Sequence, residues 1–300
     1  MATKQSSRAR RSSSSRQRGP RHVEAVLDPT WQNPYAPSPA ERQTHLDAAR
    51  RFALKRSLPA ALVLGALALV SLAGLVVSWL FLLVALALGL AAVVVVRQAS
   101  QRVEERASNL GAEVLASFAT GGTTKDRQRL STVLDRLTAT FGVDEVNAFI
   151  VDDTGYNAAL VPNGENFAFV VTSAMMSDFE LIEIEGVVAH CLARQRLGIL
   201  ARECLSATGN ASSSQRREVA GPGLTYRADE VAAAAIRYPL GLAGALRRCA
   251  RQVPSSPSFF ASPQFDKWRF IWFDVWSDRQ TPDLADLDDV ELRALALEEW

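Results

Sequence analysis

One stretch decides how this chain folds, and it reads Glu183-Ile184-Glu185-Gly186-Val187-Val188-Ala189-His190-Cys191-Leu192-Ala193-Arg194. Apolar residues recur in and beside it at intervals of three and four, which is typical of a helix with one apolar face. They are Leu181, Ile184, Val187, Val188 and Leu192. We predict a helix from Ser177 to Cys204 that is capped by Ser177 or Asp178. His190 and Arg194 are four positions apart, so they share a face of this helix.

Two short strands are predicted before this helix. The runs Val146 to Val151 and Phe167 to Thr172 are rich in β-branched and aromatic residues. The residues between them, Asp152 to Glu165, include Gly, Pro, Asn and Asp and predict a region of turns. Two further helices are predicted before the strands, from Gln98 to Phe118 and from Lys125 to Phe141. The predicted fold class is therefore α+β, a mostly helical domain over residues 98–300 with a small β-sheet.

An uncharged apolar block extends from Leu58 to Val96. A single helix of this length would measure about 58 Å, whereas the hydrocarbon core of a bilayer is about 30 Å thick. We therefore predict two transmembrane helices over residues 58–96, with a reversal between Gly74 and Trp79. A single long tilted span is the alternative, and it would place one of the two basic flanks outside the cell. The hairpin keeps both flanks, and hence the N-terminus and the main domain, on the cytoplasmic side of the cell membrane.

The residues before this block form two segments. Residues 1–39 are rich in Ser, Arg and Pro and are predicted to be disordered, because they cannot bury enough apolar surface. Their arginines are interpreted as a solvated tail that sets topology and is attracted to anionic lipid. No aromatic stacking platform accompanies them, so no nucleic-acid partner is expected. Residues 40–57 have apolar residues at helical spacing and predict a short helix at the membrane surface.

The composition sets wide limits on the class of protein. The formal net charge is +1, so the molecule as a whole is not a polyelectrolyte. Its three cysteines are too few for a disulfide framework and fit a reducing compartment. The hydrophobic share of 48% is inflated by the apolar block, so the soluble part has an ordinary composition.

The C-terminal third predicts two helices and an aromatic segment. Residues 206–223 are small and polar and are interpreted as a linker or mobile loop. A helix is predicted from Tyr226 to Val253, with a kink or a break at Pro239. Trp268, Phe270, Trp272 and Trp276 recur with period two, which favours core packing along an extended segment. An exposed patch facing a membrane or a partner is the alternative. An amphipathic helix is predicted from Asp286 to Trp300.

Several short motifs occur in an informative order. They are Asn147-Ala148, Tyr156-Asn157-Ala158, Phe169-Val170-Val171-Thr172-Ser173, Glu183 to His190 with Val187 and Ala189 between them, and Tyr226-Arg227-Ala228-Asp229. This order, with the apolar hairpin before it, resembles the HtpX-like zinc metallopeptidases, relatives of the CAAX prenyl endopeptidases. The resemblance covers about Leu58 to Arg251, and no single motif carries it.

The resemblance also implies a zinc site that this chain has largely lost. Such a site uses His-Glu-x-x-His on one helix and a glutamate from a later helix. Here the matching positions hold His190, then Cys191 for the general base, Arg194 for the second histidine and Thr225 for the glutamate. Arginine is always charged and has no lone pair for a metal. Only His190 is left as a ligand, so no cofactor is expected, and zinc only if the site is non-standard.

Each residue of this remnant has two interpretations. His190 is interpreted as a buried, hydrogen-bonded residue, with metal ligation as the alternative. Cys191 is interpreted as a packed thiol, because adjacent helix positions do not face each other and disfavour a Cys-His pair. Asp229 is interpreted either as a surviving polar residue beside the former metal site or as the partner of Arg194. We favour the ion pair, in which Arg194 occupies the former metal position.

The function implied by the resemblance is binding without catalysis. The sheet edge of such a domain binds an extended chain by strand addition, which requires no metal. We expect the segment with Phe167, Phe169 and Val171 to offer that edge to a polypeptide partner or former substrate, and we expect membrane lipids as further partners. Two alternatives stay open: an active zinc metalloendopeptidase that uses His190, Cys191 or Asp229, and a purely structural membrane protein.

Overall fold

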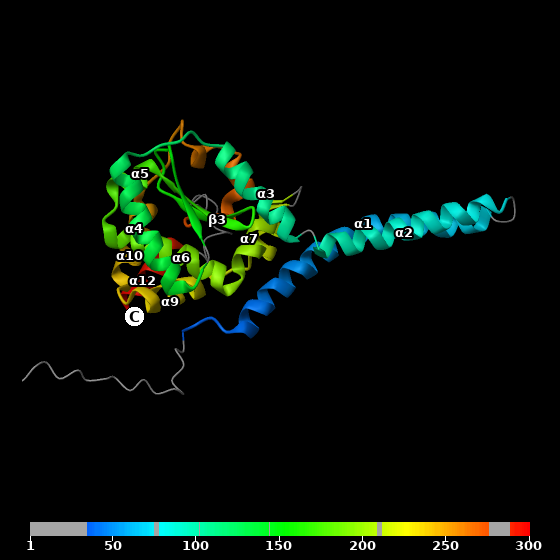
Figure 1. Cartoon of the computed structure of the whole chain (residues 1–300), viewed down its shortest axis with the longest axis horizontal. Helices are drawn as coiled ribbons and strands as arrows, with labels where there is room; N and C mark the ends of the chain where they lie inside the picture. Colours follow the sequence, from blue (N-terminus) through cyan, green and yellow to red (C-terminus); the bar gives the residue numbers. More distant parts are fainter. Residues whose placement is uncertain (1–34, 75–77, 102, 144, 209–211, 276–288) are drawn as a thin grey trace, which may run out of the picture. The chain divides into compact units, whose positions relative to one another are not determined.

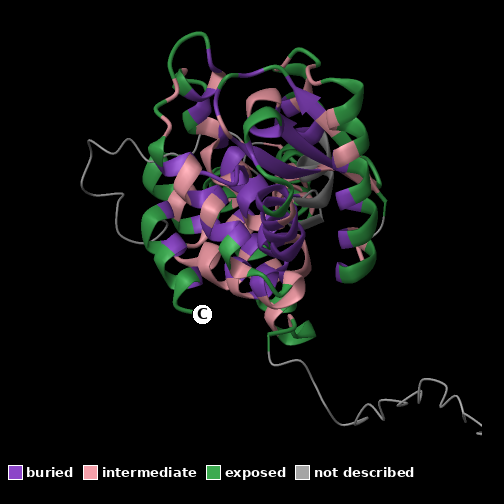
Figure 2. Ribbon diagram, turned by 90° about the vertical axis from the view of Figure 1, so that its left-hand side faces the viewer, coloured by how far each residue is buried: buried purple, intermediate pink, exposed green. Residues whose placement is uncertain are grey.

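The computed structural model describes residues 35–74, 78–101, 103–143, 145–208, 212–275 and 289–300. Most of them are helical, and three short strands form a sheet, so the predicted α+β class is confirmed. Figure 2 shows the buried residues gathered in the strands and helices at the centre of the domain. The predicted disordered tail lies outside the described residues up to Pro34, and so does Trp276.

Two long helices, α1 (Pro39–Ala73) and α2 (Leu80–Gln101), form a hairpin (Figure 1). Both are long and apolar enough to cross a membrane, in agreement with two predicted spans rather than one. The predicted surface helix at residues 40–57 is not separate, because α1 continues through Pro59 into the apolar segment. A helix end here would leave several backbone groups unpaired beside apolar residues, whereas proline removes only one hydrogen bond.

The sheet consists of β1 (Val146–Val151), β2 (Ala158–Asn163) and β3 (Asn166–Thr172), in the spatial order β1-β3-β2. Strand β1 is parallel to β3 and β2 is antiparallel to it. The sequence predicted β1 and β3 but assigned the residues of β2 to turns. Four buried apolar residues, Ala158 to Val161, form this strand, and Pro162 is tolerated near its end because β2 lies at the side of the sheet.

The predicted binding edge at β3 is wrong. Strand β3 is the central strand, so the backbone around Phe167, Phe169 and Val171 is hydrogen-bonded on both sides. The side chains of Phe169 and Val171 are fully buried. A strand in this position has no free edge for another chain. The error follows from the missed strand β2, which occupies the side that was taken as open.

Helices α3 (Val103–Ala116) and α4 (Thr124–Phe141) confirm the two helices predicted between the hairpin and the sheet. A capping box starts α4: Asp126 N donates to Thr123 Oγ1 at 3.2 Å, and Thr123 N donates to the Asp126 carboxylate at 2.9 Å. Gly142 ends α4 in the left-handed conformation, with φ of 57°. Both helix ends are therefore specified by local sequence.

The single helix predicted from Ser177 to Cys204 is three helices. These are α5 (Ser173–Asp178), α6 (Leu181–Leu197) and α7 (Ile199–Ala207). Glu180 is the N-cap of α6, in place of the predicted Ser177 or Asp178. Gly198, with φ of 78°, separates α6 from α7 in a conformation that glycine adopts at little cost. The predicted linker at residues 206–223 contains one more helix, α8 (Ser213–Ala220), which a capping box of Ser212 and Gln215 starts.

Two helices, α9 (Leu224–Ile236) and α10 (Pro239–Arg251), replace the predicted helix from Tyr226 to Val253. The break comes at Pro239, as predicted, with Pro239 in the first turn of α10. The helix predicted at the C-terminal end is confirmed as α12 (Val290–Glu298).

The aromatic segment is not extended. It forms short helical turns, η2 (Phe259–Ala261), α11 (Phe265–Trp268) and η3 (Arg269–Ile271). Core packing is nevertheless confirmed for Trp268 and Trp272, which are buried, whereas Phe270 is only partly buried. Trp272 lies 5.0 Å from Phe260, measured between ring centroids, in an edge-to-face arrangement.

Close contact between α6 and α10 depends on glycine. A Cβ atom at Gly186 would lie 2.7 Å from Cα of Leu242 and 2.8 Å from its backbone nitrogen. We expect Gly186→Ala to lower the free energy of unfolding by about 1–3 kcal/mol, because the two backbones must move apart. The matched control is Gly65→Ala in α1, where nothing lies within 4 Å of the new methyl group. Thermal unfolding of the full chain in detergent measures both, and equal effects would contradict this packing.

Candidate functional site

His190 lies at the centre of the candidate site, on α6, with no exposed surface. Its Nδ1 lies 2.6 Å from Oδ1 of Asp229, which α9 carries. The ring packs edge-on against Phe273, with 5.2 Å between the centroids. His190 is therefore a buried residue whose imidazole is hydrogen-bonded to a carboxylate.

Arg293 is the second partner of Asp229. It comes from α12 and is fully buried. Its Nε donates to Oδ2 of Asp229 at 2.7 Å and its Nη2 to Oδ1 at 2.9 Å. Such a bidentate arrangement, with two parallel N–H to oxygen hydrogen bonds, is the strongest geometry of an arginine-carboxylate pair. The favoured ion pair between Asp229 and Arg194 is wrong, because Arg293 occupies the carboxylate instead.

The charge states of this cluster follow from its burial and contacts. Burial lowers the pKa of His190 to about 4, against the attraction of Asp229, so the imidazole is neutral at pH 7. Burial alone would raise the pKa of Asp229, but Arg293 and His190 outweigh it and bring this pKa to about 2. An ionised carboxylate only accepts hydrogen bonds, so the His190 proton resides on Nδ1. The Nε2 atom then has a lone pair without a hydrogen-bond partner among the described residues.

This arrangement predicts acid sensitivity. The pKa of His190 is lower in the folded chain, about 4, than its ordinary 6.5, so between these values only the unfolded chain takes up the proton. Stability should therefore fall by roughly 3 kcal/mol as the pH falls through this range. Chemical unfolding at pH 4 and pH 7 measures the loss, and His190→Gln should remove most of it. Burial also lowers the pKa of His45, so His45→Gln is measured beside it. A loss that His45→Gln removes and His190→Gln leaves unchanged would contradict this assignment.

Arg194 forms a separate buried ion pair. Its Nε lies 2.9 Å from both carboxylate oxygens of Glu203 on α7, and its Nη2 lies 2.6 Å from Oε2. A third N–H interaction goes to the Phe270 carbonyl at 2.8 Å. Burial would lower the pKa of Arg194, but Glu203 outweighs it and raises this pKa. The guanidinium is therefore held at the position that the resemblance assigns to the second histidine.

Cys191 and Thr225 lie at the other two positions of the implied zinc motif. The Cys191 side chain is fully buried, and burial raises the pKa of its thiol to about 12, so it is protonated at neutral pH. A buried, protonated thiol cannot act as a general base. Thr225 is partly buried in the first turn of α9, one turn before Asp229.

The outer side of β2 is closed by residues that come much later in the chain. Phe273 N donates to the Ala158 carbonyl at 2.7 Å, and Trp272 forms a β-bridge with Ala159. The Asn157 side chain fixes the same segment: its Nδ2 donates to the Asp274 carbonyl at 2.9 Å, and its Oδ1 accepts from Asp274 N at 3.0 Å. The chain thus places residues 272–274 along the outer side of β2, and Phe273 of this segment packs against His190.

The residues present do not fit a zinc ion. Nε2 of His190 can supply one metal ligand, but a protein zinc site needs at least three protein ligands. Among the described residues, no three His, Cys, Asp or Glu side chains are grouped closely enough to hold a metal. Arg194 brings a positive charge instead of a lone pair. Asp229 is already neutralised by Arg293.

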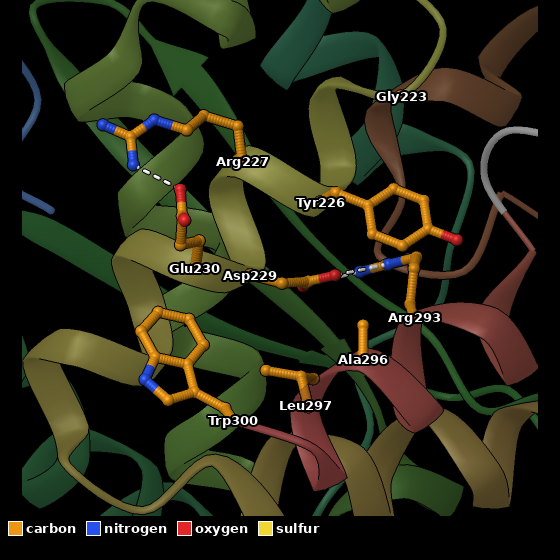
Figure 3. A pocket seen from close by; sticks show the side chains of 9 residues that line it. All are labelled: Gly223, Tyr226, Arg227, Asp229, Glu230, Arg293, Ala296, Leu297 and Trp300. Atoms are coloured by element: carbon orange, nitrogen blue, oxygen red, sulfur yellow. Dashed lines mark hydrogen bonds and ion pairs between the residues drawn. The ribbon is translucent and has the colours of Figure 1, made fainter.

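An open cavity of about 430 Å³ lies between α9 and α12 (Figure 3). The Asp229–Arg293 pair forms part of its wall, and Tyr226, Leu297 and Trp300 line it as well. Because His190 has no exposed surface, the cavity gives solvent no access to the imidazole.

Sequence reasoning missed three residues of this site: Glu203, Phe273 and Arg293. Glu203 is nine positions from Arg194 but lies beyond the break at Gly198, and Phe273 and Arg293 are far in sequence from His190 and Asp229. The sequence contained one indication that such partners exist: Arg194 and Asp229, once buried, each require a partner of opposite charge.

Comparison with known proteins adds no relative. No protein-family model matches the chain, no curated protein matches it, and no solved structure matches it. The resemblance to HtpX-like peptidases therefore rests on the order of motifs in the sequence alone.

Proposed function

We propose that the chain is a membrane-anchored, catalytically inactive protein of the HtpX-like metallopeptidase type that binds a partner polypeptide. The order of motifs supports the type, and the buried His190–Asp229 pair is compatible with it. The two apolar helices support the anchor. Basic residues at both ends of the hairpin, such as Arg56 and Arg97, favour a cytoplasmic location of the domain.

The loss of catalysis rests on the buried Arg194–Glu203 ion pair. Zinc hydrolases need a second ligand one helical turn after the first and a base beside the metal-bound water. A guanidinium occupies the first of these positions, and the buried thiol of Cys191 occupies the second. Phe273 packs edge-on against the imidazole and Arg293 lies beside its Nδ1, and no surface of the ring is exposed to an incoming substrate.

Strand addition requires a free sheet edge, and the edge at β1 is more open than the edge at β2. Strand β3 is central, and Trp272 and Phe273 cover one end of β2. Helix α3 covers the other end of β2, where Gly111 lies against the Pro162 carbonyl. Any added strand must therefore pair along β1.

On β1 the open part is centred on Ala148, which is exposed. Gly121 N donates to the Ile150 carbonyl and Asp152 N to the Ala119 carbonyl, both on the outer side. Backbone groups two residues apart point the same way, so the N–H and C=O of Ala148 also face outward. An extended segment of a partner can pair there.

Metal content tests the loss of catalysis. We expect the full chain, purified in detergent and dialysed mildly, to retain far less than one zinc per chain and to cleave no peptide substrate. Near-stoichiometric zinc that disappears in His190→Ala would overturn the proposal and restore the active metallopeptidase.

A crosslinking experiment tests strand addition. A photoreactive amino acid at exposed Glu145 should form an adduct with a polypeptide in native membranes. Ala148→Pro should abolish the adduct, because proline has no N–H to donate, whereas Ala148→Ser keeps the N–H and should preserve it. Loss in both variants, or in neither, would exclude this edge as the binding site.

A further inference from the structure

Exposed cations lie on α1 just before its apolar half begins. They are Arg50, Arg51, Lys55 and Arg56. The uncharged block begins at Leu58, two residues after Arg56, which is about 3 Å along the helix axis. The same four cations therefore lie within about 12 Å of the first residue of the predicted span.

Helices α7 and α8 bring two more cations to this place. Ala49 and Ala53 on α1 pack against Leu205 on α7 and Val219 on α8 in a small apolar cluster. Across the same contact, Arg56 Nη1 donates to the Thr208 carbonyl at 2.9 Å. This docking brings Arg202 of α7 and Arg216 of α8 beside α1. We call these two residues and the four cations of α1 the basic collar.

Cations of the basic collar lie close enough to repel each other. Burial and, after it, the charge of Arg56 lower the pKa of Arg216. Burial also lowers the pKa of Arg202, and Arg51 contributes to the lowering. Backbone carbonyls hold both guanidinium groups in place: Arg202 Nε donates to Val219 at 2.8 Å, and Arg216 Nη1 donates to Ser206 at 2.8 Å.

The acidic groups nearby do not balance this charge. Asp47 pairs with Arg50 at 3.5 Å, and Glu218 pairs with Lys55 at 3.6 Å, both at exposed positions. Asp266 acts on Arg216 and Glu203 acts on Arg202, but neither reverses the lowering of the arginine pKa by burial. Within the described part of the chain, no carboxylate pairs with Arg51 or Arg56. The basic collar therefore has an excess of positive charge just before the apolar half of α1.

We propose that the basic collar binds the phosphate of an anionic phospholipid headgroup. One guanidinium group can donate two hydrogen bonds to the oxygens of a phosphate. The guanidinium groups of the basic collar come from three different helices. The phosphate of a lipid, unlike free phosphate or a nucleic acid, is fixed at the depth where an apolar helix leaves the bilayer. This inference rests on the proposed membrane placement of α1 and α2.

Lipid titration of the full chain tests the collar. In native mass spectrometry from detergent, the chain should bind phosphatidylglycerol at least tenfold more tightly than phosphatidylcholine. Arg51→Gln with Arg56→Gln should weaken phosphatidylglycerol binding about 30-fold, at about fivefold per basic residue near the surface. The matched control removes two exposed cations of α4, Lys125→Gln with Arg127→Gln, and should change little. The basic residues of the N-terminal tail are kept in every variant.

Two results of the lipid titration would overturn the collar as a lipid site. They are equal weakening in both double variants and the absence of a lipid preference in the wild-type chain. Displacement of the lipid by inorganic phosphate at equal concentration would assign the site to free anions and would also overturn it. Extraction of native membranes with alkaline carbonate tests the anchor separately. Release of the chain would overturn the membrane placement, whereas retention without lipid preference would overturn only the collar.

Discussion

Replacing Glu203 with alanine is expected to lower the free energy of unfolding by about 3–5 kcal/mol, because it leaves a buried arginine without its counter-charge. Arg194 is 2% exposed and Glu203 is 4% exposed, so water cannot replace the lost carboxylate. The Phe270 carbonyl still accepts one hydrogen bond from Arg194, but a neutral acceptor does not offset a full charge. Chemical unfolding of the full chain in detergent, followed by tryptophan fluorescence, measures the change.

Two comparison variants separate the buried charge from ordinary truncation. Glu113→Ala removes the same side chain from the exposed Lys267–Glu113 pair, whose atoms lie 3.4 Å apart, and should change stability by less than about 0.5 kcal/mol. Arg194→Met with Glu203→Leu removes both charges and should recover most of the loss. If Glu203→Ala were as stable as Glu113→Ala, the pair would not be buried as described.

Replacing Arg293 with alanine is expected to cost a similar amount, about 3–5 kcal/mol at pH 7. The change removes both N–H groups that bind Asp229, together with a cation that lies 5.5 Å from the centre of the Phe273 ring. Without Arg293, burial dominates and the pKa of Asp229 moves above its ordinary 3.8. A carboxyl group whose pKa is higher in the folded than in the unfolded chain stabilises the fold at low pH. The stability lost in Arg293→Ala should therefore be smallest at acid pH.

Unfolding measured at pH 4 and pH 7 tests this sign. The difference between the wild-type chain and Arg293→Ala should be smaller at pH 4 than at pH 7. Arg247→Ala is the matched control, because Arg247 forms an exposed pair with Glu298 on α12 and lowers the pKa of that carboxyl. Its effect should change with pH in the same direction but by much less, because water screens an exposed pair. A difference that grows toward acid pH would show that Arg293 does not neutralise Asp229.

Local signals in the sequence were enough for most helices and for two strands. The capping box at Thr123, the glycine at Gly142 and the proline at Pro239 each act within a few residues, so their effect can be predicted. Strand β2 was missed because Asn157, Pro162, Asn163 and Gly164 suggest turns at both of its ends. Its four buried apolar residues become a strand only beside β3 and Phe273.

The sequence singled out residues of the candidate site but not their contacts. The order of motifs drew attention to His190, Arg194 and Asp229, and the structure buries all three. Their partners are not part of these motifs, since Glu203 lies beyond the break at Gly198 and Arg293 belongs to a helix far downstream. Only the three-dimensional arrangement decides that Asp229 binds Arg293 rather than Arg194.

The late position of Arg293 has a consequence for the order of folding. Arg293 follows Asp229 by 64 positions and His190 by 103. At typical rates of synthesis, about 3 to 13 seconds pass between the emergence of Asp229 and that of Arg293. The apolar hairpin leaves the ribosome long before that, so its proposed insertion into a membrane can begin while the domain behind it is unfinished. During this interval Asp229 has to stay hydrated, because burial of a carboxylate without its counter-charge is costly.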